Sequence, residues 1–258
     1  GQTQALFSLD LAFSPAERGQ YNYNPAANGT NTIPNPGSNF GGIIRQLTTT
    51  DFERSNVEYI QFWLMDPFLY DETAGSDGGT ITFNLGNISE DILKDNRKMY
   101  ENGLPEDELS TNTTETIWGK VPTNPSIIYA FNEDDNSRLI QDVGLDGLTD
   151  TEEREKYPEL ASLDDPASDN FKYYRGGDLD DLDASIISRY KFFNNTQGNS
   201  PTLNQSPESY PTSSSTYPDV EDINKDQTMN TVESYFEYKV SLNSSDLIVG
   251  QNYIVDQK

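Results

Sequence analysis

Two stretches of the chain space their oxygen-bearing side chains in the pattern of a calcium loop. A loop of the EF-hand type offers ligands at positions 1, 3, 5, 7, 9 and 12, because a hard cation needs about six to eight oxygens around it. Position 7 contributes its backbone carbonyl, and position 6 is normally a glycine that makes a sharp turn. In the first stretch, "DINKDQTMNTVE", the ligand positions fall on Asp222, Asn224, Asp226, Thr228, Asn230 and Glu233.

This first stretch matches the template at every side-chain position, but Gln227 stands where glycine is expected. A β-carbon there costs energy, because φ is positive at that position. The following "SYFEYKVSL" alternates apolar and polar residues, which indicates a strand rather than the exiting helix of an EF-hand. The sequence therefore predicts an isolated calcium loop that leads into a strand.

The second stretch, "DVGLDGLTDTEE", matches the same template less completely. Gly147 lies at position 6, where glycine is preferred. Gly144 lies at position 3 and offers no side-chain ligand, so a water molecule has to replace one. The other ligand positions fall on Asp142, Asp146, Leu148 through its carbonyl, Asp150 and Glu153.

The alternative interpretation of both stretches is a solvated acidic loop without a metal, because a chain rich in Asp and Asn matches such a template easily. Two matches that each end in Glu at position 12 favour the metal. Calcium is preferred over magnesium, since the ligand count is high and the loops are flexible. The acidic groups at 163–169 and 176–185 could add ligands, but a solvated loop is the simpler interpretation of them.

Composition limits the other kinds of chemistry. The 258 residues include no Cys and no His, which excludes the usual zinc sites and nucleophilic triads. With 43 acidic and 17 basic side chains, the net charge of −26 disfavours nucleic acids and anionic membranes as partners. Glycoside hydrolysis needs two carboxyls about 5–9.5 Å apart, and the sequence selects no such pair. We therefore predict that the chain is not an enzyme.

The elements that must position these loops are mostly strands. Alternating or apolar runs predict strands at 3–13, 57–65, 80–86 and 234–242, with 57–65 as a central core strand. Helix signals occur at 89–103 and 151–160. Residues 106–116 and the low-complexity segment 196–218 are predicted loops. The predicted fold class is mainly β with minor α, a β-sandwich of jelly-roll type with long loops and a few short helices.

Several long blocks, spread from Glu17 to about Val240, together resemble one family, the SprA/Sov family. These blocks are "ERGQYNYNP", "NFGGIIRQLTTTDFERSNVEYIQFWLMDPF", "TITFNLGNISEDILKDNRKMYENGLP", "TIWGKVPT", "QDVGLDGLTDTEE", "NNTQGNSP" and "DVEDINKDQTMNTVESYFEYKV". The family is the giant outer-membrane translocon of the type IX secretion system, a gliding-motility protein of the cell surface in Bacteroidetes. Such a resemblance implies a very large β-barrel that exports folded proteins.

The resemblance implies that residues 1–258 are one soluble domain inserted in a much larger barrel protein, exposed at the cell surface, with the periplasmic side as the alternative. The chain begins with Gly1 rather than Met and has no run of about 18 apolar residues, so we expect a piece of a longer protein that does not itself insert into the membrane. Its expected partners are the rest of the barrel, other secretion subunits and exported cargo, with calcium bracing its acidic loops.

The alternative function is a carbohydrate-binding module, because β-sandwiches with calcium and aromatic residues occur in that class. Trp63 and Trp118 could stack on sugars. However, Trp63 lies in the most apolar predicted strand and is expected in the core.

Overall fold

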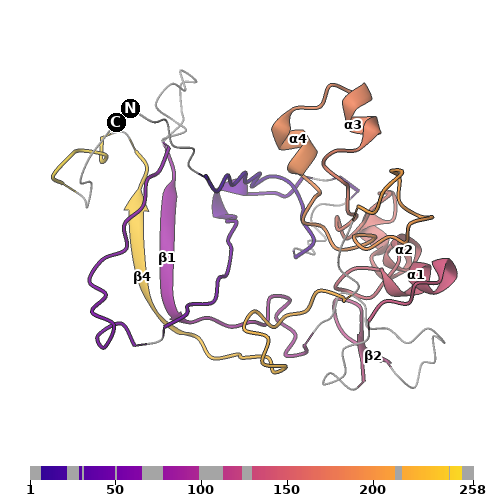
Figure 1. Cartoon of the computed structure of the whole chain (residues 1–258), viewed down its shortest axis with the longest axis horizontal. Helices are drawn as coiled ribbons and strands as arrows, with labels where there is room; N and C mark the ends of the chain where they lie inside the picture. Colours follow the sequence, from indigo (N-terminus) through magenta and orange to yellow (C-terminus); the bar gives the residue numbers. More distant parts are fainter. Residues whose placement is uncertain are drawn as a thin grey trace. The chain divides into compact units, whose positions relative to one another are not determined.

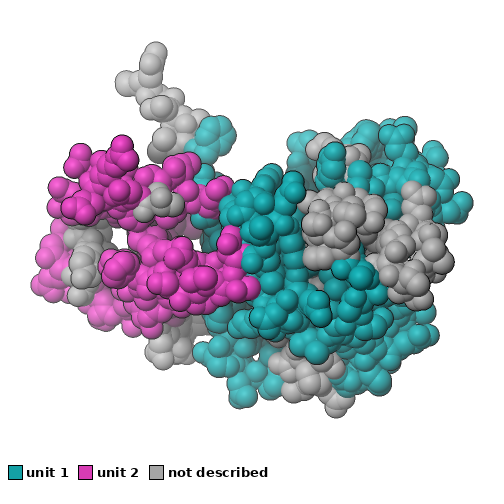
Figure 2. All heavy atoms as spheres, turned by 90° about the horizontal axis from the view of Figure 1, so that it is seen from below, with its two compact units in different colours: residues 1–45, 90–229 teal, residues 46–89, 230–258 magenta. Residues whose placement is uncertain are grey.

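The computed structural model describes residues 7–21, 29–30, 32–49, 51–65, 78–98, 113–123, 130–212, 217–243 and 245–251. The chain divides into two units, which are shown in different colours in Figure 2. Unit 1 consists of residues 1–45 and 90–229, and unit 2 of residues 46–89 and 230–258. Figure 1 shows the elements of both units along the chain.

Unit 2 contains a sheet of two antiparallel strands, β1 (Thr80–Asn87) and β4 (Ser234–Ser241). The register places apolar side chains opposite one another on one face, with the pairs Ile81–Val240, Phe83–Tyr238 and Leu85–Phe236. The alternation in the sequence predicted both strands, and the structure confirms them.

The predicted core strand at 57–65 is wrong. These residues form no strand, and Tyr59 and Met65 are 83% and 84% exposed. Trp63 is exposed too, so the expectation that it lies in the core is also wrong. An apolar run does not by itself specify a partner strand. Within unit 2, the ring of Phe62 does contact the ring of Phe83 in β1, with 5.1 Å between the ring centroids. The strand predicted at 3–13 is not formed over its described residues 7–13 either.

Unit 1 contains short elements joined by long turns. The sheet of β2 and β3 is antiparallel, and α2 followed by η4 confirms the helix predicted at 151–160. The predicted loop at 106–116 is wrong where β2 forms. The elements are η2 (Pro36–Ser38), β2 (Thr113–Glu115), β3 (Lys120–Pro122), α1 (Asp135–Gln141), α2 (Asp150–Lys156), η4 (Pro158–Leu160), α3 (Gly177–Asp181) and α4 (Ile186–Tyr190).

The apolar core of unit 1 is small. One cluster joins Leu93, Val121 and Leu145, with Trp118 and Val220 packed against it. A second cluster joins Tyr157 and Leu160, with Leu163 alongside. Trp118 thus packs in the core rather than forming a platform for sugars. Because these clusters are small, the polar groups buried beside them weigh heavily in the stability of the unit.

The helix predicted at 89–103 is wrong over its described residues 89–98. The carboxylate of Asp91 accepts hydrogen bonds from the amides of Asp95 and Asn96, at 3.1 and 3.0 Å, which a helix would direct to carbonyls. Lys94 and Asn96 both have positive φ, 54° and 58°. A side-chain-capped turn therefore replaces the helix.

In the described residues, the regular structure is a few short helices and two small antiparallel sheets, consistent with the predicted class of mainly β with minor α. The jelly-roll or sandwich arrangement is not confirmed and stays a prediction. The low-complexity segment 196–218 forms turns and bends without a helix or strand over its described residues. Among the helices of the described residues, none is both long and apolar enough to cross a membrane.

Candidate metal centre

Helix α2 carries two of the predicted ligands on one face. Thr149 caps it in a capping box, in which Glu152 accepts from the amide of Thr149 at 2.8 Å. Asp150 and Glu153 are three residues apart, so both side chains project from the same side of the helix. Glu153 is fully buried, at 0% exposed.

Three carboxylates from three segments meet at this face. Asp146 precedes α2, Glu153 belongs to it, and Asp169 comes from the segment after η4. Each offers an oxygen within 4.8 Å of the others. Asp146 and Asp169 are 8% and 3% exposed. We refer to Asp146, Glu153 and Asp169 as the inner trio.

The loop before α2 is built as the calcium template expects at positions 5 to 7. Asp146 Oδ1 accepts from the amide of Leu148 at 2.9 Å, and Gly147 has φ 69°. A β-carbon on Gly147 would lie 2.5 Å from the carbonyl oxygen of Lys120, so glycine is needed there for space as well as for φ. Residues 141–148 are all buried, which excludes a solvated acidic loop for this part of the stretch.

Asp169 supplies what the sequence template lacked. At Gly144, the position without a side-chain ligand, a β-carbon would lie 2.1 Å from Asp169 Oδ2. The carboxylate of a distant residue thus occupies the space of the missing side chain at position 3. The signal that could have found it is the glycine itself, since an empty ligand position leaves room for a ligand from elsewhere in the chain.

Asp142, predicted at position 1, holds a neighbouring turn rather than joining the inner trio. Its carboxylate accepts from the amides of Gly198 and Ser200, at 3.1 and 2.8 Å. The adjacent Gln197 exchanges backbone hydrogen bonds with the segment of Asp169: its amide donates to the Asp169 carbonyl at 3.0 Å. Asp142 therefore helps to place Asp169. Leu148 is buried, and the role of its carbonyl stays a prediction.

Each carboxylate of the inner trio has one buried oxygen without a hydrogen-bond donor. Asp146 Oδ2, Glu153 Oε1 and Asp169 Oδ1 are buried and accept no hydrogen bond. Burial raises the pKa of Asp146 to about 8. Burial and then repulsion by Asp146 raise the pKa of Glu153 to about 9, and the same causes raise the pKa of Asp169. Buried acceptors without donors are rare in folded proteins and need a partner.

A second group adjoins the first. Asp150, Glu153 and Asp165 also bring oxygens within 4.8 Å of one another, and we refer to them as the outer trio. Asp165 caps a turn by accepting from the amides of Asp169 and Asn170, at 3.1 and 3.2 Å. Neither Asp165 nor Asp169 was among the predicted ligands, although both lie in the acidic group at 163–169.

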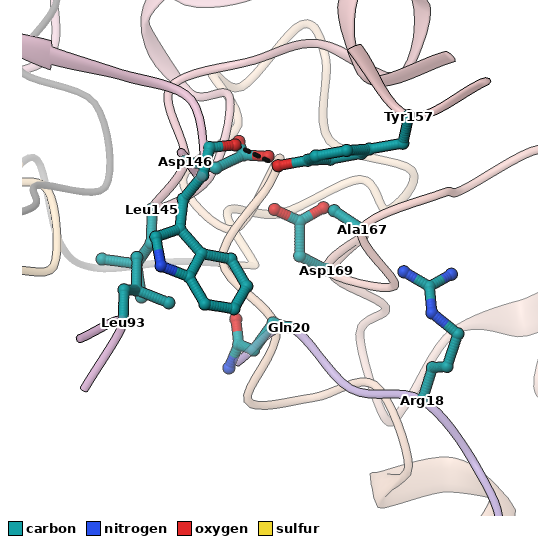
Figure 3. A pocket seen from close by; sticks show the side chains of 9 residues that line it. Arg18, Gln20, Leu93, Leu145, Asp146, Tyr157, Ala167 and Asp169 are labelled. Atoms are coloured by element: carbon teal, nitrogen blue, oxygen red, sulfur yellow. Dashed lines mark hydrogen bonds between the residues drawn. The ribbon is translucent and has the colours of Figure 1, made fainter. Parts of the chain in front are cut away.

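A small cavity of about 20 Å³ lies beside the inner trio, with room for about one water-sized occupant. Figure 3 shows Asp169 pointing into it beneath the ring of Tyr157, with Arg18 reaching toward it from another segment. The Arg18 side chain is buried, and its three guanidinium nitrogens make no hydrogen bond. Burial lowers the pKa of Arg18, and the nearby charges of Asp165 and Glu153 oppose this effect only in part.

The donor set suits a hard cation. All the side-chain donors of both trios are carboxylate oxygens, which calcium binds at about 2.3–2.6 Å. A divalent cation bound here would supply the partner that the buried oxygens lack and would offset their mutual repulsion. The residues present therefore fit a divalent cation of the calcium type.

The first predicted loop has the backbone of the calcium template, but the cation that contacts its first ligand is the ammonium group of a lysine. Asp222 accepts from the amides of Asp226 and Gln227, at 3.1 and 2.8 Å, and Gln227 has φ 69°, as position 6 requires. Asp226 accepts from the amide of Thr228 at 2.8 Å. The ammonium of Lys98 binds Asp222 Oδ2 at 3.0 Å, and both side chains are buried.

The six ligands predicted for this loop are divided between the units. Asp222, Asn224, Asp226 and Thr228 lie in unit 1, whereas Asn230 and Glu233 lie in unit 2. Within unit 2, Glu233 accepts from the amide of Ser89 at 3.4 Å. Calcium binding by all six residues stays a prediction.

This loop has a counterpart that was not predicted. The segments 90–95 and 221–226 read "EDILKD" and "EDINKD", and both form the same capped turn with positive φ at Lys94 and Lys225. The two turns are joined reciprocally, since Glu221 accepts from the amide of Leu93 at 2.9 Å and Glu90 from that of Ile223 at 3.1 Å. The repeat builds a pair of interlocked turns.

In a comparison with protein families, residues 146–258 match SprA_N, described as a motility related/secretion protein. This assigns the chain to a class of proteins concerned with motility and secretion. More specifically, the match supports the resemblance to the SprA/Sov family found in the sequence. That family is not a known enzyme family. A search of curated proteins finds no match.

Proposed function

We propose that the chain is a non-catalytic extramembrane domain of the type IX protein secretion translocon, exposed at the cell surface, and that calcium braces it. The match of residues 146–258 to the motility and secretion family SprA_N supports the role in secretion. The calcium part rests on one observation, the three buried carboxylates of the inner trio with an unpartnered oxygen on each. All ligands of both trios lie within the matched residues 146–258.

The bracing follows from where the ligands come from. The inner trio joins the turn before α2, the helix itself and the segment after η4, which are otherwise connected by small apolar clusters. Without a cation, ionised carboxylates this close repel one another by roughly 3–4 kcal/mol per pair at an effective dielectric constant of about 20. A bound ion replaces this repulsion by attraction between the ion and each carboxylate, and so fixes the three segments together.

A structural role fits better than catalysis. The cavity beside the trio has about 20 Å³, which admits no substrate larger than water. The braced domain then offers a stable surface to the rest of the barrel, to other secretion subunits and to exported cargo. We also keep the predicted β-sandwich in this proposal, with strands in addition to those of the described residues.

Thermal unfolding of the 258-residue chain tests the bracing. We expect millimolar calcium to raise the melting temperature relative to excess chelator, and Asp169→Asn to abolish that rise. Asp181→Asn removes an exposed acid of α3 and serves as the control. An unchanged melting temperature in chelator would refute the calcium part.

Secretion itself is tested in the bacterium that carries the full-length protein. We expect replacement of residues 146–258 by a flexible linker of equal length to block export of proteins with a C-terminal secretion signal and to stop gliding. Normal export with correct surface display of the altered protein contradicts the proposed role, whatever the result with calcium.

A further inference from the structure

We propose that the acidic centre binds two divalent cations at once, one in the inner trio and one in the outer trio, with Glu153 as their shared ligand. This inference rests on the calcium bracing proposed above and adds a second ion with its own ligands, Asp150 and Asp165. It makes the centre a binuclear carboxylate site rather than a single calcium loop.

Glu153 is placed to serve both ions. Its oxygens belong to both groups of carboxylates that lie within 4.8 Å. The side chain is 0% exposed, Oε2 accepts from the amide of Ala167 at 2.9 Å, and Oε1 has no partner. A carboxylate has two oxygens with two lone pairs each, so it can bind two cations while keeping its bond to Ala167.

The two other ligands of the outer trio are held in place but keep free lone pairs. Asp165 accepts one amide on each oxygen, at 3.1 and 3.2 Å. Asp150 accepts from the side-chain amide of Asn170, at 3.1 and 3.4 Å. The Asp165 oxygens each accept one bond, and Asp150 also interacts with the side chain of Gln197; two carboxylate oxygens have four lone pairs, so a cation can bind while these bonds are kept.

With all five carboxylates ionised, the charge of the centre also accommodates a second ion. Five carboxylates face one guanidinium, that of Arg18, which leaves four negative charges. One divalent cation neutralises half of this charge, and two neutralise all of it. The neighbouring basic side chains make their hydrogen bonds and ion pairs to other groups, Lys120 to Glu152, Lys156 to Glu115, and Arg154 to the carbonyls of Leu163 and Asp164, although the charges of Lys156 and Arg154 also act on Asp146 and Asp150.

The two sites differ in their access to solvent. All three ligands of the inner trio are buried, whereas Asp150 and Asp165 are half-buried. The outer ion therefore keeps more coordinated water and exchanges faster than the inner one.

Native mass spectrometry of the chain after gel filtration in dilute calcium counts the ions directly. We expect two calcium ions on the wild type, one on Asp165→Asn, one on Asp169→Asn and none on Glu153→Gln. The exposed-site control Asp181→Asn keeps two. Circular dichroism confirms that each variant is folded. Terbium provides a second readout, because Tyr157 and Trp118 line the cavity and can sensitise its luminescence.

The outcomes separate this inference from the proposed function. A wild type that holds one ion, with Asp165→Asn still holding one, overturns the second site and leaves the single bracing ion intact. A wild type that holds no ion overturns both. If Glu153→Gln fails to fold, the count on Asp165→Asn decides, because its side chain lies in the outer trio alone.

Discussion

The substitution Asp169→Asn should change the stability of the chain in opposite directions with and without calcium. Asparagine has the shape of aspartate but carries no charge. In chelator at pH 9, the wild type holds three carboxylates with oxygens within 4.8 Å and no cation among them. Removal of one charge relieves a repulsion of roughly 3–4 kcal/mol for each pair it enters, at an effective dielectric constant of about 20.

Part of that repulsion is already relieved in the wild type, because the trio retains protons up to about pH 8 at Asp146 and about pH 9 at Glu153. The expected gain from Asp169→Asn in chelator is therefore about 1–3 kcal/mol. For a chain of this size, each kcal/mol shifts the melting temperature by about 2–4 °C. The variant should thus melt roughly 2–12 °C above the wild type.

With calcium present, Asp169→Asn should make the chain less stable than the wild type. At about 100 times the dissociation constant, one bound ion stabilises the wild type by about 2.7 kcal/mol, or roughly 5–10 °C. Asp169→Asn removes a ligand and should lose most of this gain. Tryptophan fluorescence in a Trp63→Phe background reports on unit 1 alone, because Trp118 is then the only tryptophan.

Two results refute this reasoning. Equal destabilisation of Asp169→Asn in chelator and in calcium means that the Asp169 carboxylate acts through neutral packing or hydrogen bonding. A wild type that melts at the same temperature in both conditions means that no ion binds. Asp181→Asn makes the same change of charge at an exposed position and should show neither effect.

Three further predictions follow from the same geometry. In chelator, the stability of unit 1 falls as pH rises from about 4 to about 9, because Asp146 and Glu153 keep their protons in the folded chain up to about pH 8 and about pH 9 and lose them near pH 4 when unfolded; urea titrations at several pH values measure this slope, and calcium should remove it. Gly144→Ala places a β-carbon 2.1 Å from Asp169 Oδ2 and should abolish the calcium-induced rise in melting temperature, whereas Gly198→Ala, also at positive φ but with nothing within 4 Å, should keep it. Lys98→Met leaves the buried Asp222 carboxylate without its cation and should lower the free energy of unfolding by about 3–5 kcal/mol, as measured by urea denaturation. A variant as stable as the wild type would contradict this prediction.

The sequence predicted local structure where the local pattern decides it. Alternation gave β1 and β4 with their shared apolar face, because period-two patterns need only a partner strand to be satisfied. The helical segment that Pro158 ends was predicted as well, and in the structure Thr149 caps it as α2. The strand prediction at 57–65 was wrong because apolar residues alone do not specify a partner strand, and no strand pairs with this segment among the described residues.

The candidate site was predicted in part for the same reason. Spacing along one loop placed Asp146, Asp150 and Glu153 together, because one turn and one helix fix their relative positions. Asp165 and Asp169 come from a later turn, and only tertiary folding brings them to α2. The helix signals at 89–103 misled because Asp91 bonds the amides that a helix would use.

The loop at Asp222 shows that template spacing fixes the backbone of such a turn but not the identity of its cation. Gly147 and Gln227 both have φ 69°, yet Lys98 binds in one turn and an unpartnered carboxylate cluster lies beside the other. Gln227→Gly should therefore stabilise unit 1 by about 1–2 kcal/mol, since it relieves a left-handed residue, without creating a calcium response. Urea denaturation with and without calcium measures both quantities. A large new calcium response in Gln227→Gly would mean that the strained backbone, and not the ammonium of Lys98, keeps the ion out of this loop.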